Sequence, residues 1–173
     1  MQTDLAVISM MLVALCGCGY HVAGSATHIP ANVRTLTVPL FKNHTQAYHT
    51  ETAMTQAVIH EMNTRTRYRI VNTDDPSRAD AVLRGTVLTQ TVAPLTYDPN
   101  SGQTSSYLVT ITAKVTLTGA DGRVLYSNSK FSFRQQYQST QDLSAFIQED
   151  SAAVRRLSRD FAQALVSDML ESF

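Results

Sequence analysis

Apolar and polar residues alternate along several stretches of the chain, as they do in strands that bury one face. From Tyr107 to Leu117 the odd-numbered residues are apolar, while the even-numbered ones are mostly Thr or Lys. This period of two predicts an antiparallel strand with one buried side. Similar patterns predict strands over 79–92 and from Val124 through Tyr137. A break in the last pattern near Asn128 predicts a bulge or kink.

Turn-forming residues separate these strands. Residues 94–102 are rich in Pro, Asp, Asn and Gly and predict a long hairpin tip, and Gly119–Gly122 predicts a tighter turn. Upstream, 33–41 predicts a strand that Pro39 ends or confines to a sheet edge, because proline has no N–H to donate. A further short strand is predicted over 68–71.

Apolar residues at steps of three and four predict two helices. The first covers about 45–65, and Asn43 and Gln46 stand at capping-box spacing before it. The second covers about 143–170. The predicted buried stripes are Tyr48, Glu51, Met54, Ala57, Val58 and Met62 in the first helix, and Phe146, Asp150, Ala153, Val154, Leu157, Phe161, Leu165 and Met169 in the second.

The order of these elements predicts an α+β fold. We expect a two-layer sandwich, in which a mainly antiparallel four-stranded sheet carries both helices on one face. Residues 33–173 then form one domain, and we see no internal repeat.

The N-terminal segment has the features of a lipoprotein leader. Residues 5–15 are apolar apart from Ser9, which is too short a stretch to span a bilayer. They lead into Leu15-Cys16-Gly17-Cys18, so we expect 1–17 to be removed, Cys18 to carry acyl chains, and 18–32 to form a tether. Residues 1–4 contain no Lys or Arg, and the alternative is a buried N-terminal helix in a cytosolic protein.

Composition narrows the possible functions. The 14 basic and 14 acidic residues balance, which gives no global field for nucleic acid binding. Arg155, Arg156 and Arg159 fit a solvated helix face better than a nucleic-acid contact. Both cysteines lie in the processing region, so no disulfide is expected, and the core must stabilise the domain.

Catalysis finds no support in the motifs. The chain has no Gly-x-Ser-x-Gly elbow, no His-Glu-x-x-His and no Gly-rich phosphate loop. His44, His49 and His60 are not spaced as metal ligands on one helix face. We therefore expect no catalytic residues, no metal and no cofactor.

The clearest candidate site is the sheet face that the helices leave open. It is expected to carry four cations, Arg84, Lys114, Lys130 and Arg134, among Thr and Ser and without a carboxylate. One interpretation is a solvated face on which charges deter aggregation. The other is a platform for an anionic partner, because Arg and Lys pair well with phosphate.

An ordered set of motifs resembles one family along the whole mature chain. The motifs are Cys18-Gly19-Tyr20-His21-Val22, the strand Leu36 to Asn43, Glu51 with Val58 and Met62, Ala79-Asp80-Ala81-Val82-Leu83-Arg84-Gly85, and the strand Tyr107–Leu117. Together they resemble the lipopolysaccharide-assembly lipoprotein LptE, also called RlpB.

The resemblance implies a function without chemistry on a substrate. LptE proteins are outer-membrane lipoproteins that plug the β-barrel LptD, expected here at 1:1, and help it insert lipopolysaccharide into the outer leaflet. Family members bind lipopolysaccharide through basic residues near sheet loops. The predicted hairpin tip has only Asp98 as a charge, so such contacts shift to the open-face cations. Gly19 after Cys18 agrees with the outer membrane. Tyr97, Tyr107 and Tyr137 are candidate anchors for the barrel, with a place in the core as the alternative for Tyr107.

Two other classes remain as alternatives. A CsgG-like or LpoB-like periplasmic lipoprotein, acting as an oligomeric or activator module, has a similar order of strand, helix and Ala-Asp-x-x-Leu-x-Gly strand. A lipid-anchored hydrolase requires a catalytic constellation that assembles only in three dimensions.

Overall fold

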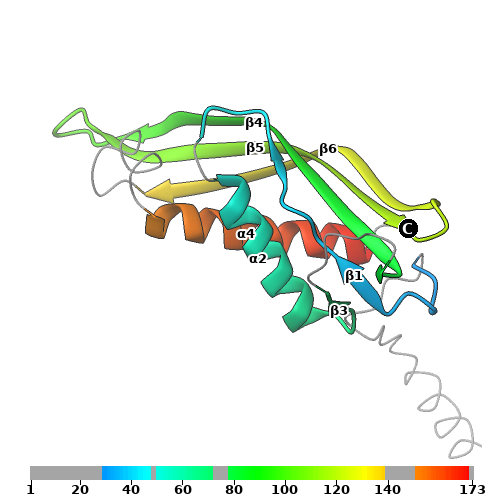
Figure 1. The fold of residues 1–173 in the computed structure, drawn as a ribbon. Coiled ribbons are helices and arrows are strands. Elements are labelled where there is room, and N and C mark those ends of the chain that lie inside the picture. Colours follow the sequence, from blue (N-terminus) through cyan, green and yellow to red (C-terminus); the bar gives the residue numbers. More distant parts are fainter. Residues whose placement is uncertain (1–28, 48–49, 72–77, 139–150, 172–173) are drawn as a thin grey trace, which may run out of the picture.

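The computed structural model describes residues 29–47, 50–71, 78–138 and 151–171 (Figure 1). The leader, Cys18 and most of the predicted tether lie outside these ranges, as do Tyr48, His49, Phe146 and Asp150. The elements are β1 (Thr35–Thr37), β2 (Lys42–Asn43), α2 (Thr50–Arg65), β3 (Arg69–Ile70), β4 (Ala81–Tyr97), β5 (Thr104–Gly119), β6 (Val124–Gln138) and α4 (Ser151–Glu171).

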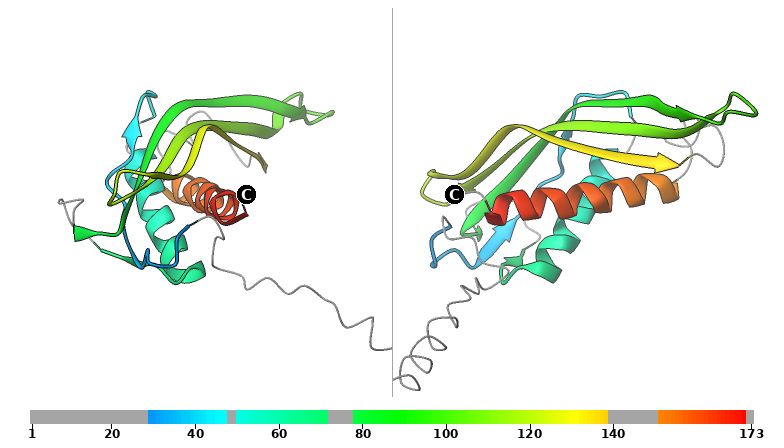
Figure 2. Two further views of the ribbon diagram at one scale, coloured as in Figure 1. Left: turned by 90° about the vertical axis from the view of Figure 1, so that its right-hand side faces the viewer. Right: turned by 180° about the vertical axis from the view of Figure 1, so that it is seen from behind.

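The predicted α+β sandwich is confirmed, with more strands than expected. The sheet has six strands in the order β3-β1-β4-β5-β6, and β2 also pairs with β4. The three long strands are antiparallel, whereas β1, β2 and β3 pair in parallel. Of the predicted strand over 33–41, the structure forms only β1, because the chain leaves the ladder before Pro39. β2, which follows the predicted range, then pairs with β4 from Lys42. Both helices cover the same face of the sheet (Figures 1 and 2).

The core lies between that face and the helices. The odd-numbered residues of β5 from Val109 to Leu117 are buried, as the alternation predicts. From α2 the buried apolar residues are Met54, Val58 and Met62. Phe161 of α4 packs edge-on against Phe131 and Phe133 of β6, with ring centroids 5.6 and 6.0 Å apart. Ile29, which we assigned to the tether, is also buried in this core.

Two predicted boundaries differ from the structure. The first helix begins at Thr50, because the Asn43 side chain folds the preceding residues into a turn: its Oδ1 accepts from the Thr45 N–H, and its Nδ2 donates to the Ala47 carbonyl and Glu51 Oε2. The predicted capping box with Gln46 is therefore wrong. The last helix is described only from Ser151, and the residues before it lie outside the described ranges.

The second difference concerns the hairpin, where β4 continues through Pro94 to Tyr97. Pro94 is tolerated because in the described chain β4 beyond Val87 has β5 as its only strand partner, so that the proline lies in an edge strand. The tip is thus shorter than predicted and covers 98–103. Gly102 has a φ of +69°, which closes the turn in the left-handed region.

Asp80 joins the start of β4 to β1. Its Oδ2 accepts hydrogen bonds from the Arg34 N–H, the Thr35 N–H and the Thr35 hydroxyl, at 2.8–2.9 Å. The Asp80 N–H donates in return to Thr35 Oγ1 at 3.0 Å. The backbone donors, Arg34 first, hold the pKa of the Asp80 carboxyl below its usual range. This explains chemically why an acid occupies that position in the Ala-Asp-x-x-Leu-x-Gly strand.

Gly85 provides space for a core side chain. The Phe41 ring lies flat against this glycine, and a Cβ added there would be 2.4 Å from Phe41 Cε2. The Phe41 side chain is only 2% exposed, and the backbone N–H of Phe41 donates to Thr55 Oγ1 on α2. The ring therefore has little freedom to move away from Gly85. Gly85 is therefore required by close packing.

Replacing Gly85 by Ala should destabilise the fold by about 1–3 kcal/mol, which is typical of overpacking a core. Urea unfolding measures the effect. In a Phe41→Leu background the smaller side chain gives way, and we expect the same substitution to cost less than half as much. An equal cost in both backgrounds would contradict the steric explanation.

The Asp80 carboxylate predicts a pH-dependent contribution to stability. A pKa below the usual value of about 3.9 means that the stabilisation is complete above that pH and is lost as pH falls through the folded-state pKa. Asp80→Asn should lower the free energy of unfolding by roughly 0.5–1 kcal/mol at pH 7, because solvent screens this accessible carboxylate. The difference from wild type should shrink markedly at pH 3. A difference of equal size at both pH values would show that charge is not the cause.

Candidate functional site

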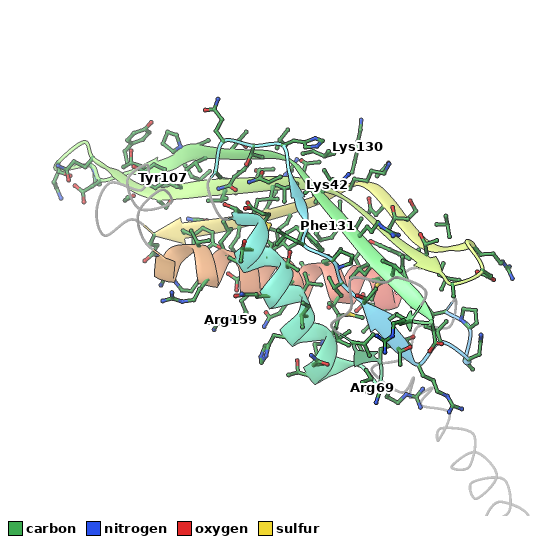
Figure 3. All side chains as sticks on the ribbon, in the orientation of Figure 1. Lys42, Arg69, Tyr107, Lys130, Phe131 and Arg159 are labelled. Atoms are coloured by element: carbon green, nitrogen blue, oxygen red, sulfur yellow. The ribbon has the colours of Figure 1, made fainter. Side chains whose placement is uncertain are left out.

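The open face of the sheet is the candidate site, and it lies opposite both helices. Arg84, Lys114, Lys130 and Arg134 are all exposed. Of the residues next to them, those that are buried in the core are Leu83, Gly85, Ala113, Val115, Phe131 and Phe133. Figure 3 shows Lys42 and Lys130 on the side of the sheet away from the helices, with Phe131 and Arg159 on the other side. The structure thus brings the four predicted cations onto one surface.

Strand register arranges these charges in rows. Lys42 on β2 pairs with Thr86 on β4, which pairs with Lys114 on β5. Lys130 lies opposite Lys114 in a bulge of β6, where the register shifts between Ala113 and Val115. Three lysines therefore share one row across four strands, a span of about 14 Å at the usual strand spacing.

Two arginines extend the row on either side. Arg84 pairs with Thr116, one open-face position from the lysine row. On the other side, the pairs Thr89–Thr112 and Thr112–Ser132 form a row of hydroxyls. Arg134 follows in the next row, opposite Thr110. The bulge near Asn128, predicted from the broken alternation, is confirmed and places Lys130 level with Lys114.

Lys42 is the cation that the sequence did not assign to this face. It follows Pro39 after a break in the alternating pattern, and it reaches the sheet through a short parallel pairing with β4. A parallel contact between residues so far apart in sequence leaves no local pattern. The only indication was its place after Phe41 in a motif shared with the family.

The face has hydrogen-bond donors and positive charge without neutralising acids. β4, β5 and β6 contain no Asp or Glu, and in the described part of the chain none of the five cations takes part in an ion pair. Thr86, Thr112 and Thr116 supply hydroxyls between them, each partly buried. Separated cations with hydroxyl donors between them suit a ligand that carries several phosphate or carboxylate groups.

The hairpin tip offers no comparable charge. Asp98 is its single charged side chain, and its Oδ1 accepts from the Asn100 N–H, the Ser101 N–H and the Ser101 hydroxyl. These bonds, that from the Ser101 N–H first, lower the pKa of the Asp98 carboxyl. The Asp98 carboxylate therefore stabilises the hairpin turn in which it lies.

The three tyrosines that we proposed as anchors have different environments. Tyr97 is 60% exposed on the hairpin. Tyr107 and Tyr137 pair across β5 and β6 and pack against the core. The Tyr137 hydroxyl donates to Asp160 Oδ2 at 3.1 Å, and burial, then the Asp160 charge, raises the pKa of this tyrosine. Tyr137 thus fastens β6 to α4, which leaves Tyr97 as the accessible candidate.

Neither a metal centre nor a membrane-spanning helix is found in the part of the chain that the structure describes. There, His, Cys, Asp and Glu side chains do not gather in groups of three or more. None of the described helices is both long and apolar enough to cross a bilayer.

Comparison with known proteins identifies the family. The model for LptE, described as lipopolysaccharide-assembly, matches residues 33–169. The chain belongs to the LptE family. This confirms the resemblance seen in the sequence motifs. No curated protein matches the sequence at a significant level.

Solved structures resemble this LptE-family chain at low sequence identity. Rare lipoprotein B from Shewanella oneidensis is 14% identical, with 79% of this chain and 93% of that one covered and a TM-score of 0.44. Lipoprotein B from Nitrosomonas europaea is 16% identical over 88% and 96% of the two chains, with a TM-score of 0.42. The PelC dodecamer from Paraburkholderia phytofirmans is 13% identical over 82% and 95%, with a TM-score of 0.42.

Proposed function

We propose that this chain is an outer-membrane lipoprotein, anchored through Cys18, that occupies the lumen of the LptD β-barrel and contacts lipopolysaccharide. Membership of a lipopolysaccharide-assembly family supports the biological role. The observation that carries the molecular proposal is the open face, where Lys42, Lys114 and Lys130 share one row without a carboxylate in the three long strands. No step in this role requires catalysis.

Charge spacing supports phosphate as the group recognised. The lysine row and the Arg134 row are separated by Thr112 and Ser132, about 13–14 Å apart along the strands at the usual rise per residue. A ligand with two or more separated anionic groups can therefore engage both rows at once. A single phosphate can engage only one, so affinity should rise with the number of phosphates.

The exterior of the domain also suits a barrel lumen. The interior of a wide outer-membrane barrel is polar, so a plug needs a polar surface that still makes specific contacts. The open face supplies Thr, Ser, Lys and Arg, and Tyr97 adds one exposed aromatic side chain at the hairpin. A tyrosine in such a position is a typical anchor at protein interfaces.

Charge reversal of the open face should weaken lipopolysaccharide binding. Changing Lys42, Arg84, Lys114, Lys130 or Arg134 singly to Glu should each reduce the affinity of the mature chain about three- to tenfold, or about 0.7–1.4 kcal/mol. The loss should be largest at low ionic strength, because salt screens exposed charges. Fluorescence titration with purified lipopolysaccharide measures both effects.

Arg159→Glu is the matched control for this series. Arg159 is an exposed arginine on α4, away from the open face, so its reversal changes net charge equally (Figure 3). The affinity of the Arg159→Glu chain for lipopolysaccharide should equal that of the wild-type chain. Unchanged binding in all five open-face variants, or an equal loss in the control, would refute the platform.

The tagged chain should co-purify from membranes with one large heat-modifiable barrel at 1:1. Replacing Cys18 by Ser should lower the amount of this chain in the membrane more than it lowers binding of the chain to the barrel. The reason is that we assign membrane attachment to the lipid and barrel recognition to the domain. Quantitative immunoblotting of both proteins tests this. Self-oligomers without a barrel would favour a CsgG-like or LpoB-like module, and a folded Cys18→Ser chain unable to bind a barrel would contradict this division of roles.

A further inference from the structure

The second half of β6 is a regular strand at the edge of the sheet. Residues 131–138 pair with 106–113 of β5 without interruption. In the described chain β6 is the last strand of the sheet, with no strand beyond it. In an antiparallel strand alternate residues direct their N–H and C=O groups away from the existing partner. This segment therefore presents a row of backbone hydrogen-bonding groups.

The two long free edges of the sheet differ in how they are protected. The outer part of β4 has register shifts around Leu88 and Leu95 and contains Pro94, which are features that prevent another strand from pairing. The first half of β6 has the bulge and Lys130. Residues 131–138 have neither bulge nor proline, and Arg134 is their only charge. The edge is thus left open over one defined segment.

Contacts on its helix side hold this segment rigid. Phe131 and Phe133 pack edge-on against Phe161, and the Tyr137 hydroxyl donates to Asp160. From behind, β6 and α4 lie side by side along one flank of the domain (Figure 2). The fold already holds this part of β6 in an extended conformation. Binding of an added strand would therefore cost little conformational entropy in β6, which favours binding.

A groove lies beside this edge on the helix side. It has a volume of about 710 Å³ and is lined by Phe133 and Gln135 of β6, by Glu61 and Arg65 of α2, and by Asp160, Gln163, Ala164 and Ser167 of α4. Phe133 and Gln135 are alternate residues of the strand, so they project to the same side. A strand added to β6 would direct every second side chain toward this groove.

The charged groups of the groove already have partners. Glu61 Oε1 lies 3.3 Å from Arg65 Nη1, which also donates to Ser167 Oγ at 2.9 Å, and Asp160 accepts from Tyr137. Gln135 and Gln163 contribute exposed amides. Uncharged hydroxyl or amide side chains therefore fit the groove best.

The opposite side of the edge favours an acidic partner. Lys130 and Arg134 project to the open face, and β6 contains no carboxylate. A second copy of the chain would bring its own Lys130 and Arg134 to the same surface, which is unfavourable. A strand with Asp or Glu at alternate positions would place opposite charges there.

We propose that residues 131–138 of β6 bind an extended acidic segment of another protein by adding a strand to the sheet, with its acidic side chains toward the open face and its hydroxyl or amide side chains in the groove. Backbone bonds give such complexes affinity, and alternate side chains give specificity. This docking surface shares Arg134 with the phosphate platform and borders it at Lys130, but the proposal rests on the backbone edge and the groove of β6 and does not require phosphate binding.

Amide hydrogen exchange of the full mature chain, with a nine-residue peptide alternating Thr and Asp, tests the proposal. Saturating peptide should slow exchange at alternate residues of 131–138 at least tenfold. The matched Thr and Lys peptide should bind at least tenfold more weakly, and Arg134→Glu should reverse that preference. Gln163→Trp should obstruct the groove and weaken binding, whereas Arg159→Trp, on the same helix but outside the groove, should not.

Three results would overturn the proposal. The first is slow exchange of all eight amides in dilute chain without peptide, because the edge would then already be covered. The second is binding of the acidic peptide without slower exchange in β6, which would place it elsewhere. The third is protection that rises with protein concentration together with a dimeric mass, which would make a second copy the occupant. None of these outcomes bears on lipopolysaccharide binding, so the two proposals are tested independently.

Discussion

The packing of β4, β5 and β6 against the two helices is the constraint on which the other features depend. Because successive side chains on a strand point to opposite faces, burial of Val109, Ile111 and Val115 fixes the direction of every residue between them. Lys114 is exposed on the open face for the same reason that Val115 is in the core. The cationic surface and the hydrophobic core are thus two results of one register, and a slip of one residue would exchange them.

Sequence periodicity was sufficient to predict the architecture and four of the five open-face cations. Three of them lie in stretches of regular local alternation, and Lys130 lies just after the break near Asn128, where the alternation resumes. Periodicity was insufficient where structure depends on distant contacts. Pro39 ends one strand, and only pairing with β4 returns Lys42 to the sheet. The register shift at Leu88 also reverses the alternation, so that Gln90 pairs with the core residue Ile111 although it is even-numbered. Unlike the bulge near Asn128, which the broken alternation predicted, this shift in β4 was not predicted from the local pattern.

The start of the first helix was missed for a related reason. Asn43 satisfies several backbone and side-chain partners at once, and it delays the start of α2 to Thr50. Asn43 can be recognised in the sequence as a capping residue, but the sequence does not show which of several competing hydrogen bonds its side chain makes. The free edge of β6 and the groove beside it could likewise not be predicted from the sequence, because they form only when α2, α4 and the sheet come together.

The contact between Phe41 and Gly85 links the interior to the surface in a way that bears on genetics. Phe41 immediately precedes Lys42, and its ring rests on the strand whose next residue, Thr86, pairs with that lysine. The packing of the Phe41 ring therefore constrains the backbone from which the Lys42 side chain extends. If the open face binds the ligand as we propose, an allele that enlarges residue 85 would be scored in cells as a binding defect, although the altered atom lies in the core and not at the binding surface.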